Sequence, residues 1–225
     1  MPVHNEQACL PELLRRLEAV LDGQIVAVDD ASTDESFRVL RQYRPQRCRI
    51  KAVRLARNVG SQQALLCGLR WTGGDAVITL DADLQHPPEH IPDMVGAWRA
   101  GADIVEMVRN SADDLSPLRA AGTRLFYAGL RAFTRAAVSP LDSDFRLLDR
   151  RCVEQLLAMR PPGFIRSAVA TLDAPRRRLE FEAPTRFAGE SSYSFPRLIR
   201  AAVDAFASPR WRAPYEVAES HESAP

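Results

Sequence analysis

Short apolar runs alternate with longer amphipathic segments over the first 108 residues of the chain. The predicted strands are Met1–Val3, Ile25–Asp29, Ile50–Leu55, Val77–Leu80 and Ile104–Val108. The predicted helices are Leu10–Leu21, a segment opening after Ser32, Gln62–Trp71 and Pro92–Ala100. This alternation is typical of a mostly parallel sheet flanked by helices, so the fold class that we expect is α/β.

The pattern changes after Val108. A polar stretch leads into a predicted long helix, Leu118–Val138, in which arginines stand among apolar residues. Two interpretations of this helix stay open: a helix packed on the protein surface, or one that lies at a membrane surface. We expect one domain over residues 1–208, with a first strand that is cut short by the start of the chain. Residues 209–225 are expected to be a polar, frayed tail.

Polar residues follow each of the first four predicted strands. They are Asn5-Glu6, Asp29-Asp30, Arg57-Asn58 and Asp81-Ala82-Asp83. Open parallel sheets bind ligands at the carboxyl ends of their strands. We therefore expect one rim of one sheet to carry the chemistry.

The stretch that begins at Asp81 is the strongest of these signals. Alternation along an extended chain points Asp81 and Asp83 the same way. Two carboxylates aimed at one place suit Mg²⁺ or Mn²⁺, and Gln85 adds a neutral oxygen. Pro87-Pro88 is expected to end the loop and start a helix. The alternative is a capped turn with exposed acids.

The acids at the end of the second strand have a similar choice of roles. Asp29 and Asp30 could accept hydrogen bonds from ribose hydroxyls or a base N–H, with Ser32 capping the helix behind them. The alternative is a purely structural cap. Asp34 is expected only to complement the helix dipole.

Composition excludes several classes of protein. The net charge is +1 and Lys51 is the one lysine, which argues against a dedicated nucleic-acid binder. The four cysteines are scattered without zinc-ligand spacing, so a reducing cytosolic setting is expected. No stretch approaches the roughly 18 apolar residues that a membrane-spanning helix requires, so the chain as given is not expected to cross a bilayer.

These motifs, from Pro2 to about Ser208, resemble the family 2 glycosyltransferases, in particular the polyprenyl-phosphate sugar transferases. The resemblance implies a GT-A-like fold and a divalent metal, Mg²⁺ or Mn²⁺. It also implies nucleotide contacts, with the metal held by the stretch from Asp81 to Gln85. The residues implied to bind the nucleotide sugar in these stretches are Pro2, His4, Asn5, Glu6, Asp29, Asp30, Asn58, Asp81, Ala82 and Asp83.

Two later segments extend the resemblance. Asp142-Ser143-Asp144-Phe145-Arg146-Leu147 is similar to a D-F-R-L segment, which implies Asp144 at the donor sugar or in catalysis and Arg146 at phosphate; Asp142 is the alternative acid. The alternative interpretation of this segment is an acidic turn before a strand, with Arg146 in a surface ion pair. The segment from Arg186 to Tyr193 is similar to an R-x-x-G-x-S-K-Y loop, in which Arg186 would bind phosphate and Ser192 replaces the lysine.

The implied activity is inverting transfer of a hexose from a UDP- or GDP-sugar to a polyprenyl-phosphate lipid. Attachment to the inner face of the membrane would be peripheral, through Leu118–Val138 and Phe195–Ala207. Two alternatives are a non-catalytic nucleotide-binding remnant of the same fold and a family 2 transferase with a different acceptor. A processive polysaccharide synthase is disfavoured, because Arg70-Trp71 lacks the glutamine of a Q-x-x-R-W segment and stands elsewhere in the chain.

Overall fold

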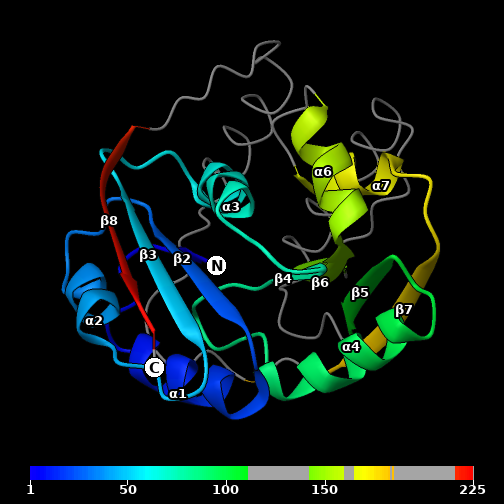
Figure 1. Ribbon diagram of the computed structural model, residues 1–225, viewed down its shortest axis with the longest axis horizontal. Coiled ribbons are helices and arrows are strands. Elements are labelled where there is room, and N and C mark those ends of the chain that lie inside the picture. The colour runs from blue at the N-terminus through cyan, green and yellow to red at the C-terminus, as the bar shows by residue number, and fades with distance from the viewer. Residues whose placement is uncertain (111–141, 160–164, 183, 185–215, 225) are drawn as a thin grey trace, which may run out of the picture.

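A computed structural model describes residues 1–110, 142–159, 165–182, 184 and 216–224 (Figure 1). The elements are β1 (Pro2–Val3), α1 (Leu10–Val20), β2 (Gln24–Asp29), α2 (Ser36–Gln42), β3 (Arg49–Leu55), α3 (Ser61–Arg70), β4 (Ala76–Thr79), a 3₁₀ turn (Pro88–His90), α4 (Ile91–Arg99), β5 (Ile104–Arg109), β6 (Asp142–Asp149), α6 (Arg150–Ala158), α7 (Ile165–Thr171), β7 (Arg176–Phe181) and β8 (Val217–Ser223). The predicted strands and helices up to residue 109 agree with this order. The predictions for Leu118–Val138, Arg186 and Phe195–Ala207 lie outside the described residues.

The strands form two four-stranded sheets rather than the single sheet expected. In one, with the order β1-β2-β3-β8, the pairs β1–β2 and β2–β3 are parallel. In the other, with the order β4-β6-β5-β7, β6 runs antiparallel to both neighbours, while β5 and β7 are parallel. The fold is therefore α/β, with its parallel pairs concentrated in the N-terminal part.

Helices cover the strands on two sides (Figure 1): α1 and α4 lie on one side, and α3 and α6 on the other. The largest apolar cluster joins α1 and α4 to both sheets, through residues such as Leu13, Met94, Ala27 and Leu147. A second cluster packs α3, α6 and α7 together. At Gly68 a Cβ atom would lie 3.2 Å from Val28 Cγ2, so the glycine allows α3 to approach β2 closely.

The expected frayed tail is wrong in part, because residues 217–223 form strand β8. This strand pairs antiparallel with β3, from Ile50–Ser223 to Leu55–Val217. Arg41 Nη1 lies 3.0 Å from Glu219 Oε1, which ties β8 to α2 as well. The strand covers an edge of the sheet by backbone hydrogen bonds, and it needs no apolar alternation to do so.

The predicted capping of α2 is also wrong. The helix begins at Ser36, and Asp34 Oδ1 accepts a hydrogen bond from the Ser36 N–H at 2.9 Å. Ser32 Oγ instead accepts from the Asn5 N–H at 3.0 Å, so its hydroxyl joins two loops. Burial opposes ionisation of Asp34, but its hydrogen bonds with Ser36 and Gln7 outweigh it and lower its pKa.

Among the described residues, no helix combines the length and the apolar character needed to cross a bilayer.

Candidate nucleotide-sugar site

The loops after β1 and β2 are joined by hydrogen bonds through Asn5. Asn5 has a left-handed backbone, with φ of 58°, and its N–H donates to Ser32 Oγ. Its side-chain Oδ1 accepts from the Thr33 N–H at 2.8 Å. The predicted juxtaposition of these two strand ends is therefore present.

His4 extends the same contact to the third strand. Its Nδ1 lies 2.9 Å from the Asp30 carbonyl oxygen, so Nδ1–H is the donor. Its Nε2 then accepts from the Asn58 side-chain amide, at 3.3 Å. His4, Asn5 and Asn58 are exposed, which leaves three polar side chains on one rim.

Asp29 and Asp30 are both buried, and donors of the chain itself reach their carboxylates. Asp29, at 0% exposure, accepts from the Ser32 N–H at 3.3 Å and lies 3.4 Å from Arg54 Nε. Asp30 accepts from the N–H groups of Val59 and Gly60 at 2.7 and 2.8 Å, at the start of α3. Burial raises the pKa of Asp30 against these two bonds. The described contacts are those of structural caps, and contacts with a nucleotide stay a prediction.

The loop after β4 does not alternate between buried and exposed residues, because Asp83, at 9% exposure, is buried like its two neighbours. Ala82 and Leu84 belong to the apolar core, at 3% and 5% exposure. Asp83 Oδ1 accepts from the Gln85 N–H at 3.1 Å, which closes a tight turn. Leu84 has φ of 64°, a backbone conformation that a non-glycine residue rarely adopts. The turn is thus anchored on its apolar side and strained at one residue.

His86 holds this loop in place through a hydrogen bond and ring contacts, a role that the sequence did not predict. Its Nδ1 accepts from the Asp81 N–H at 2.9 Å, and its ring stacks on Phe145 with centroids 5.3 Å apart. The edge of Phe181 completes the contact at 6.1 Å. Burial, together with the positive charge of Arg109, lowers the pKa of His86 to about 3. The imidazole is therefore neutral near pH 7 and acts as an acceptor.

Asp81 lies near two other carboxylates. Burial, with the neighbouring carboxylates of Asp144 and Asp83, raises the pKa of Asp81 to about 7. The Asp81 side chain keeps 38% of its surface accessible, so a cation from solution can reach it. A divalent cation would offset the repulsion between these carboxylates, so the donor set fits Mg²⁺ or Mn²⁺.

The described residues contain no group of three His, Cys, Asp or Glu side chains that would hold a metal alone. Mg²⁺ commonly takes one or two protein carboxylates and completes its shell with water and substrate phosphates. The carboxylates of Asp81 and Asp83 match that mode of binding. Gln85 Oε1 lies 3.4 Å from Arg109 Nη2, which brings a guanidinium to the same loop.

Asp144 lies on β6, where the sequence allowed an acidic turn. Its Oδ1 accepts from Arg146 Nη2 at 3.2 Å and Arg166 Nε at 3.0 Å. Its Oδ2 accepts from Arg166 Nη2 at 2.9 Å and Gln62 Nε2 at 3.1 Å. Burial alone would raise the pKa of Asp144, but the ion pairs with Arg166 and then Arg146 hold it well below its usual range.

Arg146 is 3% exposed and also donates to the Ser143 carbonyl oxygen at 2.6 Å. Thr79 Oγ1 donates to the Asp144 carbonyl oxygen at 2.5 Å, which fixes β6 beside β4. Asp144 and Arg146 thus lie on the strand beside β4, which leads into the loop of Asp81, and their roles stay a prediction. Gln62, His86, Arg109 and Arg166 were not predicted as site residues. Two of them had a local signal: Gln62 stands shortly after Asn58, and His86 directly follows the Asp81–Gln85 stretch.

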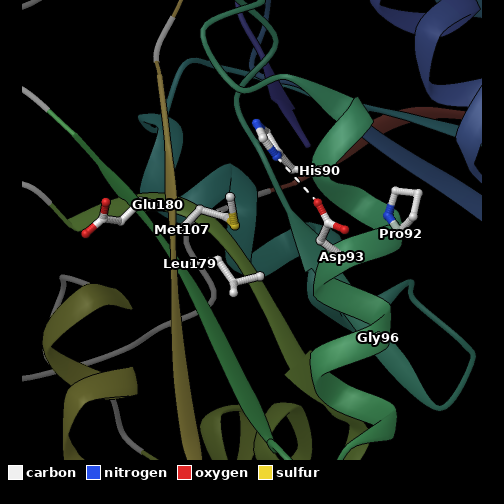
Figure 2. Close-up of a pocket in the computed structure, with 7 residues that line it drawn as sticks. All are labelled: His90, Pro92, Asp93, Gly96, Met107, Leu179 and Glu180. Atoms are coloured by element: carbon white, nitrogen blue, oxygen red, sulfur yellow. Dashed lines mark ion pairs between the residues drawn. The ribbon is translucent and has the colours of Figure 1, made fainter.

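A separate shallow groove of about 490 Å³ lies between α4 and strands β5 and β7 (Figure 2). Pro92 and Gly96 line it from the helix, and Met107 and Leu179 from the strands. None of its lining residues is among the predicted site residues, so this groove is not the candidate nucleotide-sugar site.

The fold and the strand-end loops define a class of protein. Residues 1–157 match the sequence model of the family described as Glycosyl transferase family 2, and the chain belongs to this family.

Particular relatives narrow the comparison. The chain is 39% identical over 213 residues to an undecaprenyl-phosphate 4-deoxy-4-formamido-L-arabinose transferase of Pseudomonas paraeruginosa, covering 91% of this chain and 62% of the relative. It is 30% identical over 211 residues to an uncharacterized glycosyltransferase of Bacillus subtilis, covering 91% of this chain and 65% of the relative. The chain therefore spans less than two thirds of the length of these relatives.

Solved structures share the fold. Glucosyl-3-phosphoglycerate synthase from Mycobacterium tuberculosis, in complex with Mn²⁺ and UDP-glucose, superposes with a TM-score of 0.62 at 17% identity, covering 96% of this chain and 83% of the other. TarS 1-349 of S. aureus, in complex with UDP-GlcNAc, gives a TM-score of 0.60 at 17% identity, covering 94% and 66%. These similarities establish the GT-A fold of the chain.

Proposed function

We propose that this chain carries the catalytic domain of an inverting glycosyltransferase, which moves a sugar from a nucleotide diphosphate to a polyprenyl-phosphate lipid. The observation that carries the proposal is that β6 places Asp144, ion-paired with Arg146 and Arg166, beside the end of β4 from which the Asp81 loop emerges. Such a site can receive a metal and a diphosphate together. The name of the Pseudomonas relative supports a lipid-phosphate acceptor.

The donor's nucleotide would lie along the rim of the first sheet. His4, Asn5 and Asn58 offer exposed polar atoms to a base or ribose. The other residues proposed to bind the nucleotide sugar are Pro2, Glu6, Asp29, Asp30, Asp81, Ala82, Asp83 and Arg186. For Asp29 and Asp30 the proposal requires acceptor capacity beyond the bonds already described, and an ionised carboxylate has about four acceptor positions.

Asp81, Asp83 and Gln85 would hold the metal, Mg²⁺ or Mn²⁺. When bound, such an ion supplies charge neutralisation for a leaving diphosphate. The chain's own contribution is to fix the loop through Ala82, Leu84 and His86, so that the carboxylates face the donor without reorganising.

At the sugar, Asp144 and Arg146 are the proposed catalytic pair. An acceptor phosphate is already ionised near neutral pH, so attack on the anomeric carbon requires no proton to be removed. Asp144 would then stabilise the donor sugar through its charge, and the guanidinium of Arg146 would favour departure of the diphosphate. Attack from the face opposite the diphosphate inverts the anomeric centre.

The donor sugar is either a hexose, as the sequence suggested, or a pentose derivative such as the one in the name of the Pseudomonas relative. The acceptor would be reached at the inner face of a membrane, where we propose that the protein binds peripherally.

Donor turnover tests the proposal directly. Purified protein is incubated with Mn²⁺ or Mg²⁺, undecaprenyl phosphate, and a panel of UDP- and GDP-linked hexoses and 4-amino-pentose derivatives. We expect sugar-lipid formation that requires metal and falls at least about 100-fold in Asp83→Ala, since electrostatic groups of this kind contribute on that order. Asp93→Ala is the matched control, because Asp93 is an exposed acid outside the site, with 73% of its side chain accessible.

Two outcomes would contradict the proposal. Nucleotide binding without turnover across the whole panel would favour the non-catalytic remnant. Turnover onto water or an alcohol, with no transfer to the lipid phosphate, would favour a family 2 transferase with a different acceptor.

A further inference from the structure

Gln62 and Arg166 were not among the predicted site residues, and the side chains of both donate hydrogen bonds to Asp144. Gln62 lies on the first turn of α3 and Arg166 on the first turn of α7, while Asp144 lies on β6. The three residues are separated by 82 and 22 positions along the chain. Their meeting point is therefore a product of tertiary structure, and Thr79, two residues before Asp81, donates to the Asp144 carbonyl oxygen at 2.5 Å.

The contacts on Asp144 fill its carboxylate. Each oxygen accepts two N–H donors, at distances from 2.9 to 3.2 Å. An ionised carboxylate has about four acceptor positions, so this set is complete. Arg166 supplies two of the four bonds in a bidentate pair, which is the arrangement that fixes the plane of a carboxylate most firmly.

Gln62 makes the cluster continuous between helices. Its Nε2 donates to Asp144 Oδ2 at 3.1 Å, and its Oε1 accepts from the Ile165 N–H at 3.1 Å. Ile165 is the first residue of α7, where backbone N–H groups have no partner within the helix. The amide of Gln62 is thus held at both ends, and the start of α7 is held with it.

Burial makes this arrangement rigid. Asp144 and Arg146 are 6% and 3% exposed, and the side chain of Arg166 is 21% exposed. Removing one partner from a buried ion pair leaves an uncompensated charge, so the remaining groups would move to find new partners. Arg166 and Gln62 are only partly buried, so the cluster is not closed off from solvent.

We propose that Arg166 is a positioning residue for the sugar-transfer step: with Gln62, it fixes Asp144 as an oriented anion beside the donor sugar. Asp144 so held acts by its charge and place, and it does not take up a proton. This inference rests on the proposed function, because it concerns the transfer reaction at the same site.

Three variants separate this role from a structural one. Arg166→Met keeps an unbranched apolar stem and removes the guanidinium group with its charge. We expect kcat to fall about 100-fold, since a displacement of about 1 Å in a reacting group costs on that order. The KM for the nucleotide sugar should change less than about threefold, because the nucleotide loops are untouched. Arg166→Lys keeps a positive charge without the bidentate fork, so its kcat should lie between those of the wild type and Arg166→Met. Gln62→Met should lower kcat less than Arg166→Met, because the ion pair remains.

Arg176→Gln is the matched control. Arg176 donates to the carbonyl oxygens of Val169 and Leu172, at 2.6 and 2.7 Å, near the other end of α7. The substitution removes these hydrogen bonds to α7 and leaves the contacts of Asp144 unchanged. We therefore expect a kcat close to that of the wild type. The melting temperature of every variant is measured alongside the kinetics.

Several results would overturn the inference. One is an Arg166→Met enzyme with wild-type kcat and KM. Another is an equal loss of kcat and melting temperature in Arg166→Met and Arg176→Gln, which would mean that Arg166 only holds α7 in place. Absence of turnover in the wild type across the donor panel would overturn the proposed function and this inference together.

Discussion

Backbone strain in the described residues is concentrated in the loops that carry the candidate site. Asn5, Ala31 and Leu84 have φ of 58°, 52° and 64°, although none of them is glycine. Each follows a different strand, β1, β2 or β4, at its carboxyl end. Left-handed backbone costs a non-glycine residue about 1–2 kcal/mol. Strain of this kind persists where the surrounding contacts determine the conformation, and it is common at functional sites.

Gly60 offers a test of this strain at one residue. Its φ of 89° and ψ of 153° fall in a region that is essentially open only to glycine, and its N–H donates to Asp30. A Cβ atom would meet nothing within 4 Å, so the cost of a side chain is conformational. We expect Gly60→Ala to lower the free energy of unfolding by about 1–3 kcal/mol in urea denaturation.

Gly73→Ala is the matched control for that experiment. Gly73 also has open space around a built Cβ, and its φ is not in the left-handed range. The free energy of unfolding should change little. Equal values for the two variants would show that the loop at Gly60 relaxes without cost.

Among the elements, α1 is fastened to the chain that leads into β3. Glu18 on α1 accepts from Tyr43 Oη at 2.6 Å, from the Arg47 N–H at 2.9 Å and from the Gln46 N–H. The hydrogen bond from Tyr43, followed by the opposing effect of burial and the two backbone bonds, leaves the pKa of Glu18 below its usual value. The same pairing and burial raise the pKa of Tyr43. One carboxylate therefore closes the loop between α2 and β3.

We expect Glu18→Gln to destabilise the protein by about 1–2 kcal/mol at pH 7, because hydrogen bonds to a charged acceptor are stronger than those to a neutral one. The unfolded chain binds a proton at Glu18 more readily than the folded protein does. The stabilisation is therefore complete above the ordinary pKa of 4.5 and is lost as the pH falls through the lower folded value.

Urea denaturation of both proteins between pH 7 and pH 3 measures this. The difference in the free energy of unfolding between the wild type and Glu18→Gln should become smaller below about pH 4.5. Glu12→Gln is the control, because the partner of Glu12 among the described residues is the exposed Arg15, on the same helix. A gap that is the same at every pH would mean that the charge of Glu18 contributes nothing.

At the scale of the whole molecule, the site lies where two sheets with different strand directions come together. The loops that we propose bind the nucleotide follow β1, β2 and β3, and the loop of Asp81 follows β4 in the second sheet. The largest apolar cluster spans both sheets, so it fixes one half of the site against the other. A ligand that contacts both halves should therefore stabilise the entire fold.

We expect UDP or GDP with Mn²⁺ to raise the melting temperature. Binding to the folded state alone stabilises by about 2.7 kcal/mol at a hundredfold excess over Kd. For a chain of this size, that corresponds to several degrees. Differential scanning fluorimetry with each nucleotide also identifies the base.

Asp81→Asn separates the metal from the nucleotide in that experiment. The substitution removes a carboxylate that Asp144 and Asp83 repel, so the protein without ligand should be no less stable than the wild type. The Mn²⁺-dependent part of the shift should disappear. If the nucleotide raised the melting temperature of the wild type equally in EDTA and in Mn²⁺, metal binding at Asp81 would be contradicted.

The sequence by itself determined the N-terminal architecture and the central motif. Apolar runs of β-branched residues and leucines at helical spacing are local signals, and they located the elements up to Arg109 within a few residues. Pro87-Pro88 likewise marked the 3₁₀ turn Pro88–His90 that leads into α4. These features depend on near neighbours in the chain, which is why a pattern could reveal them.

Only the tertiary structure decided the rest. Strand β8 is too polar for an apolar pattern, and it exists because β3 has backbone groups left to pair. The partners of Asp144 come from α3 and α7, and no spacing along the chain predicts that Gln62 and Arg166 meet there. His86 supports the Asp81 loop because its ring packs against Phe145 and Phe181, which are distant from it in the sequence. Contacts between distant residues are chosen by packing of the whole fold, so a linear pattern does not contain them.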